Sequence, residues 1–188
     1  MASRSAHIRA QRSRRGFTLV ETLVALLILV IMSGIVIMGI PVAFDTYTKA
    51  VDGSNAQVLL STTTSELRNE FGLAQDARTE GGTLYYMTGD GYWASLENTN
   101  QGIKKHVYLG VEPGGTEAEG SPVLLVSRSA QTDALRVKFD SVAYADGVFT
   151  VNGLKVVRAN DANTVLAGIG QDSSGQYKVR AIALGEGR

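Results

Sequence analysis

The sequence predicts an α+β protein, in which a long N-terminal helix packs on the antiparallel β-sheet of a globular head. Residues 22–44 contain no charged side chain and are dominated by Leu, Val, Ile and Met. Apolar residues then recur at helical spacing as far as Phe71, and beyond Thr83 they recur at every second residue. The chain has 188 residues, which is long enough for one domain and an appended element.

The N-terminal arm, residues 1–16, is strongly basic. It holds five arginines and no acid, whereas the rest of the chain has 13 basic and 18 acidic side chains, so the formal net charge of the whole is zero. This asymmetry is typical of a targeting arm on a mildly acidic body. No Lys/Arg cluster with interleaved aromatic residues follows Arg15, which argues against nucleic-acid binding. The sequence has no cysteine, so disulfides and thiolate metal sites are excluded.

The uncharged segment is long enough to cross a membrane. As a helix, its 23 residues span roughly 34 Å, against a hydrocarbon thickness of ~30 Å. The segment is apolar on all sides, and the residues after it are too polar to wrap a helix of this length. We therefore predict a transmembrane helix over residues 17–44. By the positive-inside rule, the arginines before it keep the N-terminus cytoplasmic and send the head across the membrane.

A single carboxylate, Glu21, stands near the start of this helix. At the bilayer centre it would cost roughly 2.5–3.5 kcal/mol, and less near an interface. One interpretation is that Glu21 lies at the cytoplasmic edge as a helix-start residue, since Thr18 and Glu21 have the spacing of a capping box. Another is that a positive charge meets the carboxylate inside the membrane.

Two export signals are alternatives to a permanent anchor. A cleaved secretory signal fits poorly, because the apolar segment is longer than the usual stretch of about 7–15 residues and no A-x-A site follows it. A twin-arginine export signal is the more serious alternative, since Arg14 and Arg15 precede the apolar segment. The chain would then be a bitopic or exported envelope protein outside any filament.

The stretch RRGFTLVETLVALLIL, residues 14–29, resembles the processing and assembly motif of type IV prepilins and type II secretion pseudopilins. The matching elements are a basic leader that ends in Gly16, then Phe17 and Glu21 at fixed spacing, then an unbroken apolar helix. The resemblance implies that prepilin peptidase cuts between Gly16 and Phe17, removing residues 1–16, and that the new amine of Phe17 is N-methylated. It also implies that Glu21 meets the N-terminal amine of a neighbouring subunit as helices stack into a fibre.

The implied pairing has a physical reason. A buried charge without its partner typically costs several kcal/mol, and Phe17 and Glu21 lie four residues apart on one helical face. Stacked neighbours can therefore satisfy each other and set the axial register. Pilin helices often have a proline nearer the cut than Pro41. We still expect Gly34, Gly39 and Pro41 to mark a zone where the helix kinks or locally unwinds.

Residues 45–78 are expected to continue the helix in amphipathic form, and residues 79–188 to form the head. Two apolar stripes run along the continuation: Tyr47, Val51 and Val58 in one, and Leu60, Leu67 and Phe71 in the other. Leu73 lies on neither stripe, which indicates that the helix ends there. Residues 52–55, Asp-Gly-Ser-Asn, are a candidate kink or short break.

The head is predicted to be an antiparallel sheet of roughly five to seven short strands. Strand candidates flank a turn at residues 88–91 and two further turns at Asp146-Gly147 and Asn152-Gly153. Near the C-terminus, the stretch QYKVRAIAL alternates, with Tyr177, Val179 and Ala181 on one side and Lys178 and Arg180 on the other, which is typical of a half-buried strand.

Side chains with catalytic or ligand-binding potential are scarce in the head. His106, beside two lysines, is expected to be a partly exposed strand histidine, and no Walker, HExxH, GxSxG or EF-hand pattern occurs. The loops at Asp161 and Asp172 lack the acidic ladder of a Ca²⁺ site. We therefore predict no enzyme activity, cofactor or metal. Four aromatic residues cluster around one hairpin: Tyr85, Tyr86, Tyr92 and Trp93. They could form an adhesive surface, but we favour packing on a face of the sheet.

These features favour a structural subunit of a type IV pilus or related filament over an enzyme. The stretch TLVA at residues 22–25 is similar to low-abundance pilins, and the absence of cysteine removes the disulfide loop of many major pilins, so we favour a minor pilin or pseudopilin. The resemblance implies as partners other pilin subunits, prepilin peptidase with its methyltransferase activity, an inner-membrane assembly platform, and lipid before assembly. The expected location is the cytoplasmic membrane, and then a cell-surface or periplasm-spanning filament.

Overall fold

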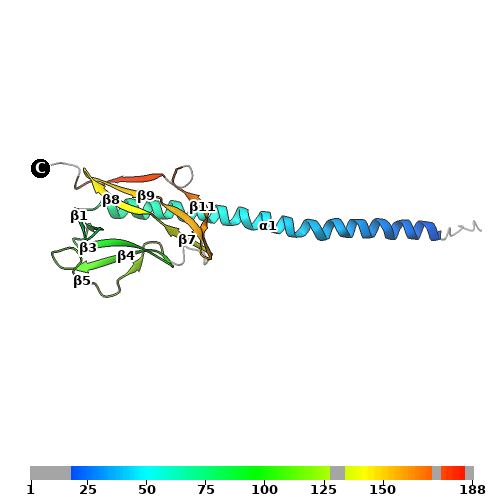
Figure 1. Cartoon of the computed structure of the whole chain (residues 1–188), viewed down its shortest axis with the longest axis horizontal. Coiled ribbons are helices and arrows are strands. Elements are labelled where there is room, and N and C mark those ends of the chain that lie inside the picture. The colour runs from blue at the N-terminus through cyan, green and yellow to red at the C-terminus, as the bar shows by residue number, and fades with distance from the viewer. Residues whose placement is uncertain (1–17, 128–133, 171–174, 185–188) are drawn as a thin grey trace, which may run out of the picture. The chain divides into compact units, whose positions relative to one another are not determined.

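The computed structural model describes residues 18–127, 134–170 and 175–184, in a chain that divides into two units, residues 1–47 and 48–188. One helix, α1 (Leu19–Gly72), contributes to both units. In the first unit the described residues from Leu19 onward are all helical. The second unit combines the remainder of α1 with antiparallel strands, which gives the α+β head that the sequence predicts (Figure 1).

The described part of the head contains twelve strands, more than the roughly five to seven expected from sequence patterns. In chain order they are β1 (Asp76–Glu80), β2 (Thr83–Met87), β3 (Trp93–Thr99), β4 (Gly102–Leu109), β5 (Thr116–Glu117), β6 (Val123–Leu124), β7 (Leu135–Lys138), β8 (Ser141–Ala145), β9 (Val148–Asn152), β10 (Lys155–Arg158), β11 (Asp161–Gly168) and β12 (Gln176–Arg180).

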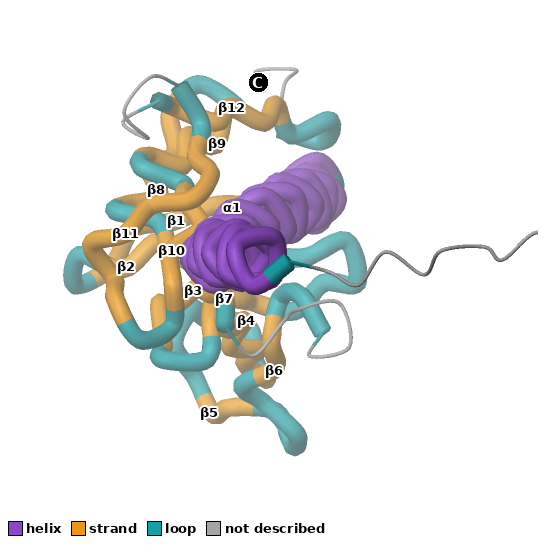
Figure 2. Tube along the Cα trace, turned by 90° about the vertical axis from the view of Figure 1, so that its right-hand side faces the viewer, coloured by secondary structure: helices purple, strands orange, loops and turns teal. Residues whose placement is uncertain are grey.

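These strands form three sheets instead of one. The largest has the order β1-β2-β3-β4-β5, with β6 also paired to β4, and the two smaller sheets have the orders β11-β10-β7 and β12-β9-β8. Figure 2 shows strands of these sheets on different sides of the helix. Every recorded strand pair is antiparallel and most neighbours are consecutive in sequence, as expected for a head built from hairpins.

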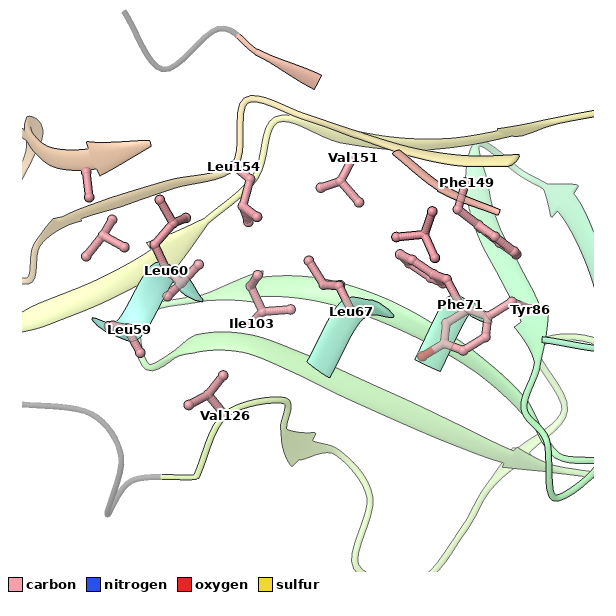
Figure 3. Close-up of a cluster of buried hydrophobic side chains, with 14 of the residues drawn as sticks. Leu59, Leu60, Leu67, Phe71, Tyr86, Ile103, Val126, Phe149, Val151 and Leu154 are labelled. Atoms are coloured by element: carbon pink, nitrogen blue, oxygen red, sulfur yellow. The ribbon is translucent and has the colours of Figure 1, made fainter. Parts of the chain in front are cut away.

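The part of α1 inside the head is amphipathic, as predicted. The buried side chains recur at steps of three and four along one face, and they are Ala56, Leu59, Leu60, Thr63, Leu67 and Phe71. The other predicted stripe faces outward, with Val58 61% exposed. Figure 3 shows the helical side chains facing Val151 and Phe149, with Ile103 beside Leu67 and Tyr86 beside Phe71. The core of the head is therefore built around one face of this helix.

Aromatic rings close the core where α1 ends. Phe71 stacks on Phe149 with ring centroids 4.4 Å apart, and Tyr86 meets Phe71 edge-on at 5.1 Å. The helix stops at Gly72, which confirms the indication from Leu73, and β1 begins at Asp76, inside the segment 45–78 that was expected to be helical. Residues 52–55 remain helical, with no break. Tertiary contacts hold this stretch, since Asp52 binds Arg158 at 2.6 Å and Ala56 is fully buried.

Both predicted turns lie between strands, and the first joins two strands that pair with each other, whereas the second leads from one sheet to another. β8 and β9 pair across Asp146 and Gly147, which both have positive φ, 50° and 75°, as a tight two-residue hairpin requires. The turn at Gly153 also has positive φ, 63°, and a Cβ there would collide with the Asp140 carboxylate. Only glycine fits this second position without strain.

Candidate processing and assembly segment

The start of α1 is capped in the way the sequence suggests. The backbone N–H of Glu21 donates to the Thr18 side-chain oxygen at 3.2 Å, which satisfies one of the free donors at the helix N-terminus. This is the first half of the predicted capping box. Gly16 and Phe17, the residues of the predicted cleavage and methylation site, lie outside the described residues.

The apolar side chains of the first unit are exposed in the part of the chain that the structure describes. From Leu19 to Phe44 every large hydrophobic side chain is about half exposed or more, with Leu19 reaching 81%. Hydroxyl groups in this unit bond to carbonyls of their own helix: Thr22 to Leu19 at 2.8 Å and Ser33 to Leu29 at 2.7 Å. A helix that is apolar outside and satisfies its own polar groups meets the requirements of a lipid environment. By length and composition, α1 can cross a membrane.

Glu21 lies within the first turn of α1 and its side chain is exposed. Among the described residues, its carboxylate has no ion-pair partner. A carboxylate in the first turn interacts favourably with the positive end of the helix dipole. A full countercharge would have to come from outside the described part of the chain. Such a charge would also have to reach an exposed position at the helix start.

The predicted kink zone lies inside continuous helix. α1 runs through Gly34, Gly39 and Pro41 without an interruption. Pro41 has no N–H, so the hydrogen bond to the carbonyl four residues earlier cannot form. A Cβ added at Gly34 or Gly39 would meet nothing within 4 Å. A kink or local unwinding at these residues stays a prediction.

The described part of the head contains no cluster of His, Asp or Glu with the geometry of a metal site. His106 is a half-buried residue of β4, as expected. Asp161 is engaged by its own loop, since the N–H of Asn163 and the hydroxyl of Thr164 donate to its carboxylate. The Thr164 hydrogen bond, followed by that of Asn163, lowers the pKa of Asp161. Asp172 lies outside the described residues.

The aromatic side chains around the β2–β3 hairpin differ in their burial. Tyr86 and Trp93 are both fully buried, which confirms sheet packing for these two, whereas Tyr92 is 47% exposed. A pocket of about 240 Å³ lies beside Tyr86 and Phe71, and both polar and apolar groups line it. The one charged group in that lining, Asp140, is paired with Lys155 at 2.9 Å. The pocket therefore presents no free charge to a ligand.

Sequence patterns did not identify a polar cluster that joins α1 to the largest sheet. Glu70 of α1 accepts from the Lys105 ammonium at 2.6 Å and from the Tyr86 hydroxyl at 3.2 Å. Burial, followed by the nearby Glu70 carboxylate, raises the pKa of Tyr86 well above its ordinary value of 10.0. In the sequence Glu70 looks like one more solvent-facing charge among polar neighbours.

Residues 11–37 match the family model of the prokaryotic N-terminal methylation motif, the class III signal of type IV pilins and pseudopilins. The matched segment includes the basic leader, Gly16, Phe17 and Glu21, and most of the exposed apolar helix. Proteins with this signal are structural and not enzymatic. No curated protein and no solved structure matches the chain.

Proposed function

We propose that this chain is the precursor of a minor pilin or pseudopilin, a structural subunit of a type IV pilus or related filament. The observation that supports this most directly is the methylation motif at residues 11–37, placed at the start of an exposed apolar helix. A motif match on a buried helix would not have supported assembly through that helix. Here the large apolar side chains from Leu19 to Val42 are exposed, so they are available for lipid and then for neighbouring helices.

The proposed processing has three steps. The arginine-rich leader keeps the N-terminus in the cytoplasm while the apolar helix enters the membrane and the head crosses it. Prepilin peptidase then cuts between Gly16 and Phe17 and methylates the new amine. An inner-membrane assembly platform moves the processed subunit from lipid into a filament of pilin or pseudopilin subunits. The head takes no catalytic part, in keeping with the structural role of proteins that carry this signal.

In the filament, Glu21 binds the N-terminal amine of a neighbouring subunit. Its carboxylate is exposed and unpaired among the described residues, and it lies four residues beyond Phe17, an axial rise of about 6 Å. Each processed subunit therefore presents an ammonium and a carboxylate about one turn apart. Stacked helices join the charge of one subunit to the opposite charge of the next, which sets the register and removes the cost of an unpaired charge in apolar surroundings.

The processing step is tested by mass spectrometry of the N-terminus of the protein from envelopes of cells with and without prepilin peptidase. We expect a methylated Phe17 terminus with the peptidase and an intact Met1 terminus without it. Intact Met1 in both strains, or a cut beyond Ala43 in both, would instead establish the bitopic or exported envelope protein.

The pairing step is tested by Glu21→Gln, which keeps the size of the side chain and removes its charge. We expect normal cleavage but strongly reduced incorporation into sheared filaments, measured by immunoblot against the membrane fraction. Ser33→Ala is the matched control, because its hydroxyl bonds only to the carbonyl of Leu29 in its own helix. Equal incorporation of both variants would show that the Glu21 charge has no role in assembly.

A further inference from the structure

His106 bridges two strands through both of its ring nitrogens. Its Nδ1 lies 2.6 Å from a carboxylate oxygen of Glu117 in β5, and its Nε2 lies 2.9 Å from a carboxylate oxygen of Glu97 in β3. A carboxylate can only accept here, so both nitrogens must donate. A neutral imidazole has one N–H and the imidazolium has two. The observed arrangement therefore belongs to the protonated form of His106.

The groups that surround the ring make it sensitive to its charge. β3 contributes Glu97, β5 contributes Glu117, and His106's own strand contributes Lys104 and the Tyr108 ring, which stacks on it at 6.4 Å. β6, the remaining strand paired with β4, contributes only apolar side chains. Lys104 lies opposite Glu97 in the strand register. Among the described ion pairs, Glu117 is bound by His106 alone.

Glu117 lies at the end of a loop that covers the only tryptophan of the chain. β4 ends at Leu109, and residues 110–115 return to the sheet at β5, whose two residues pair with Tyr108 and Leu109. Figure 1 shows β3, β4 and β5 side by side. Within the loop, the carbonyl of Val111 accepts from the Trp93 indole N–H at 2.9 Å. We call residues 110–115 the cover loop.

Trp93 is buried although it does not belong to the main core. Its neighbour Ala94 faces the core around α1, so the alternation along β3 directs Trp93 to the opposite face of the sheet. There the cover loop and Arg78, 5.2 Å above the indole ring, enclose it. The loop also passes against Tyr85, since a Cβ on Gly114 would lie 3.2 Å from the Tyr85 hydroxyl oxygen. Release of this loop would expose an aromatic face.

We infer that His106 is a pH-dependent clasp, which when protonated ties β5 to β3 and closes the cover loop over Trp93, and when neutral releases the loop and uncovers the aromatic face. The return strand has only two residues, so its backbone pairing alone is a weak anchor. Loss of one of the two His106 hydrogen bonds, together with the loss of charge attraction, then acts on one of the two shortest strands of the sheet.

The direction of titration agrees with this geometry. Partial burial lowers the pKa of His106, but the hydrogen bonds from Glu117 and Glu97 and the charges of these two groups raise it, and the net pKa is above the ordinary value of 6.5. A histidine whose pKa is raised by folding stabilises the folded arrangement fully below pH 6.5. This stabilisation is lost as the pH rises through the raised pKa. The clasp is therefore closed in mildly acidic solution and opens as the pH rises.

The test uses the full-length chain in detergent micelles with the substitution His7→Gln, which leaves His106 as the only histidine. The imidazole resonances then report the protonation of His106 alone, and acrylamide quenching of fluorescence reports the exposure of Trp93 alone. The pH is raised from about 5.5 until the His106 resonance shows complete loss of the proton. We expect the quenching constant to rise severalfold with the same midpoint as the resonance.

Glu117→Gln should give high quenching at every pH, because the neutral amide lacks the charge that holds the imidazolium. Glu119→Gln, which removes an exposed acid two residues further along, should keep the transition. If quenching stays constant while His106 loses its proton, or follows a different midpoint, the clasp does not exist. Retention of the pH transition in Glu117→Gln would equally overturn the proposal. The Glu117 side chain is 43% exposed, so its replacement leaves the head folded.

Discussion

Replacing Glu70 by alanine should destabilise the head, although Glu70 is a charged residue near the end of a helix. Tyr86, which is 1% exposed, would lose the acceptor for its hydroxyl, and an unsatisfied buried group of this kind costs about 1–3 kcal/mol. The Lys105 side chain is 20% exposed and can turn to water, so its lost ion pair adds less than about 1 kcal/mol. Alanine favours helix, so α1 itself is not weakened. We expect a loss of about 2–3 kcal/mol in the free energy of unfolding.

The measurement is guanidinium unfolding of the full-length protein in detergent, followed by the fluorescence of Trp93, which is buried in the head. Glu66→Ala, one turn earlier on α1, is the matched control and should cost less than about 0.5 kcal/mol. The double variant Glu70→Ala/Tyr86→Phe removes the stranded hydroxyl as well, so it should be more stable than the sum of the two single losses predicts. Equal stability of the Glu70→Ala and Glu66→Ala proteins, or simple additivity in the double variant, would refute the proposed coupling.

Three further outcomes follow from the same structure. Leu67→Ala should cost about 2–5 kcal/mol of unfolding free energy, because Leu67 is fully buried in the core, while Val58→Ala on the exposed stripe should stay within about 0.5 kcal/mol in the same unfolding assay. Gly153→Ala should cost more than about 1 kcal/mol of unfolding free energy, since Gly153 has positive φ and an added Cβ would clash with Asp140. Gly72→Ala is the matched control, because a Cβ there meets no atom, and it separates this effect from a general intolerance of alanine. Because burial and Glu70 raise the pKa of Tyr86, its phenol should stay protonated well above pH 10.0 in the folded head. The stability that this provides is lost as the pH rises through the raised pKa. Ultraviolet titration should therefore show ionisation of Tyr86 only together with alkaline unfolding.

Local patterns in the sequence predict much of the helix and of the candidate assembly segment. The stripe through Leu60, Leu67 and Phe71 indicates the buried face of α1, because side chains at steps of three and four must lie on one side of a helix. The strict alternation around Val179 predicts β12 for the corresponding reason in a strand. The methylation motif depends on residue types at fixed spacing along a single helix, so it too can be recognised without a fold.

Strands without such a pattern were missed. β1 has the sequence DARTE and is a strand because each of its residues pairs with β2, from Asp76 opposite Met87 to Glu80 opposite Thr83. β11 begins in a polar turn and pairs with β10 through two register shifts. The two-residue strand β5 exists only as a partner of β4. In each case the neighbouring strand, and not the local composition, determines the conformation.

The side-chain clusters of the head likewise could not be predicted from local sequence patterns. Glu70 finds Lys105 and Tyr86 from sequence separations of 35 and 16 residues, and His106 lies between carboxylates from two different strands. The amino-acid sequence alone specifies which residues are apolar and how often they recur along the chain. That is sufficient to predict a helix able to cross a membrane and a head in which a helix packs on β-sheet. The identity of each polar partner depends on strand register and on the path of the loops, which arise only when distant segments pack together.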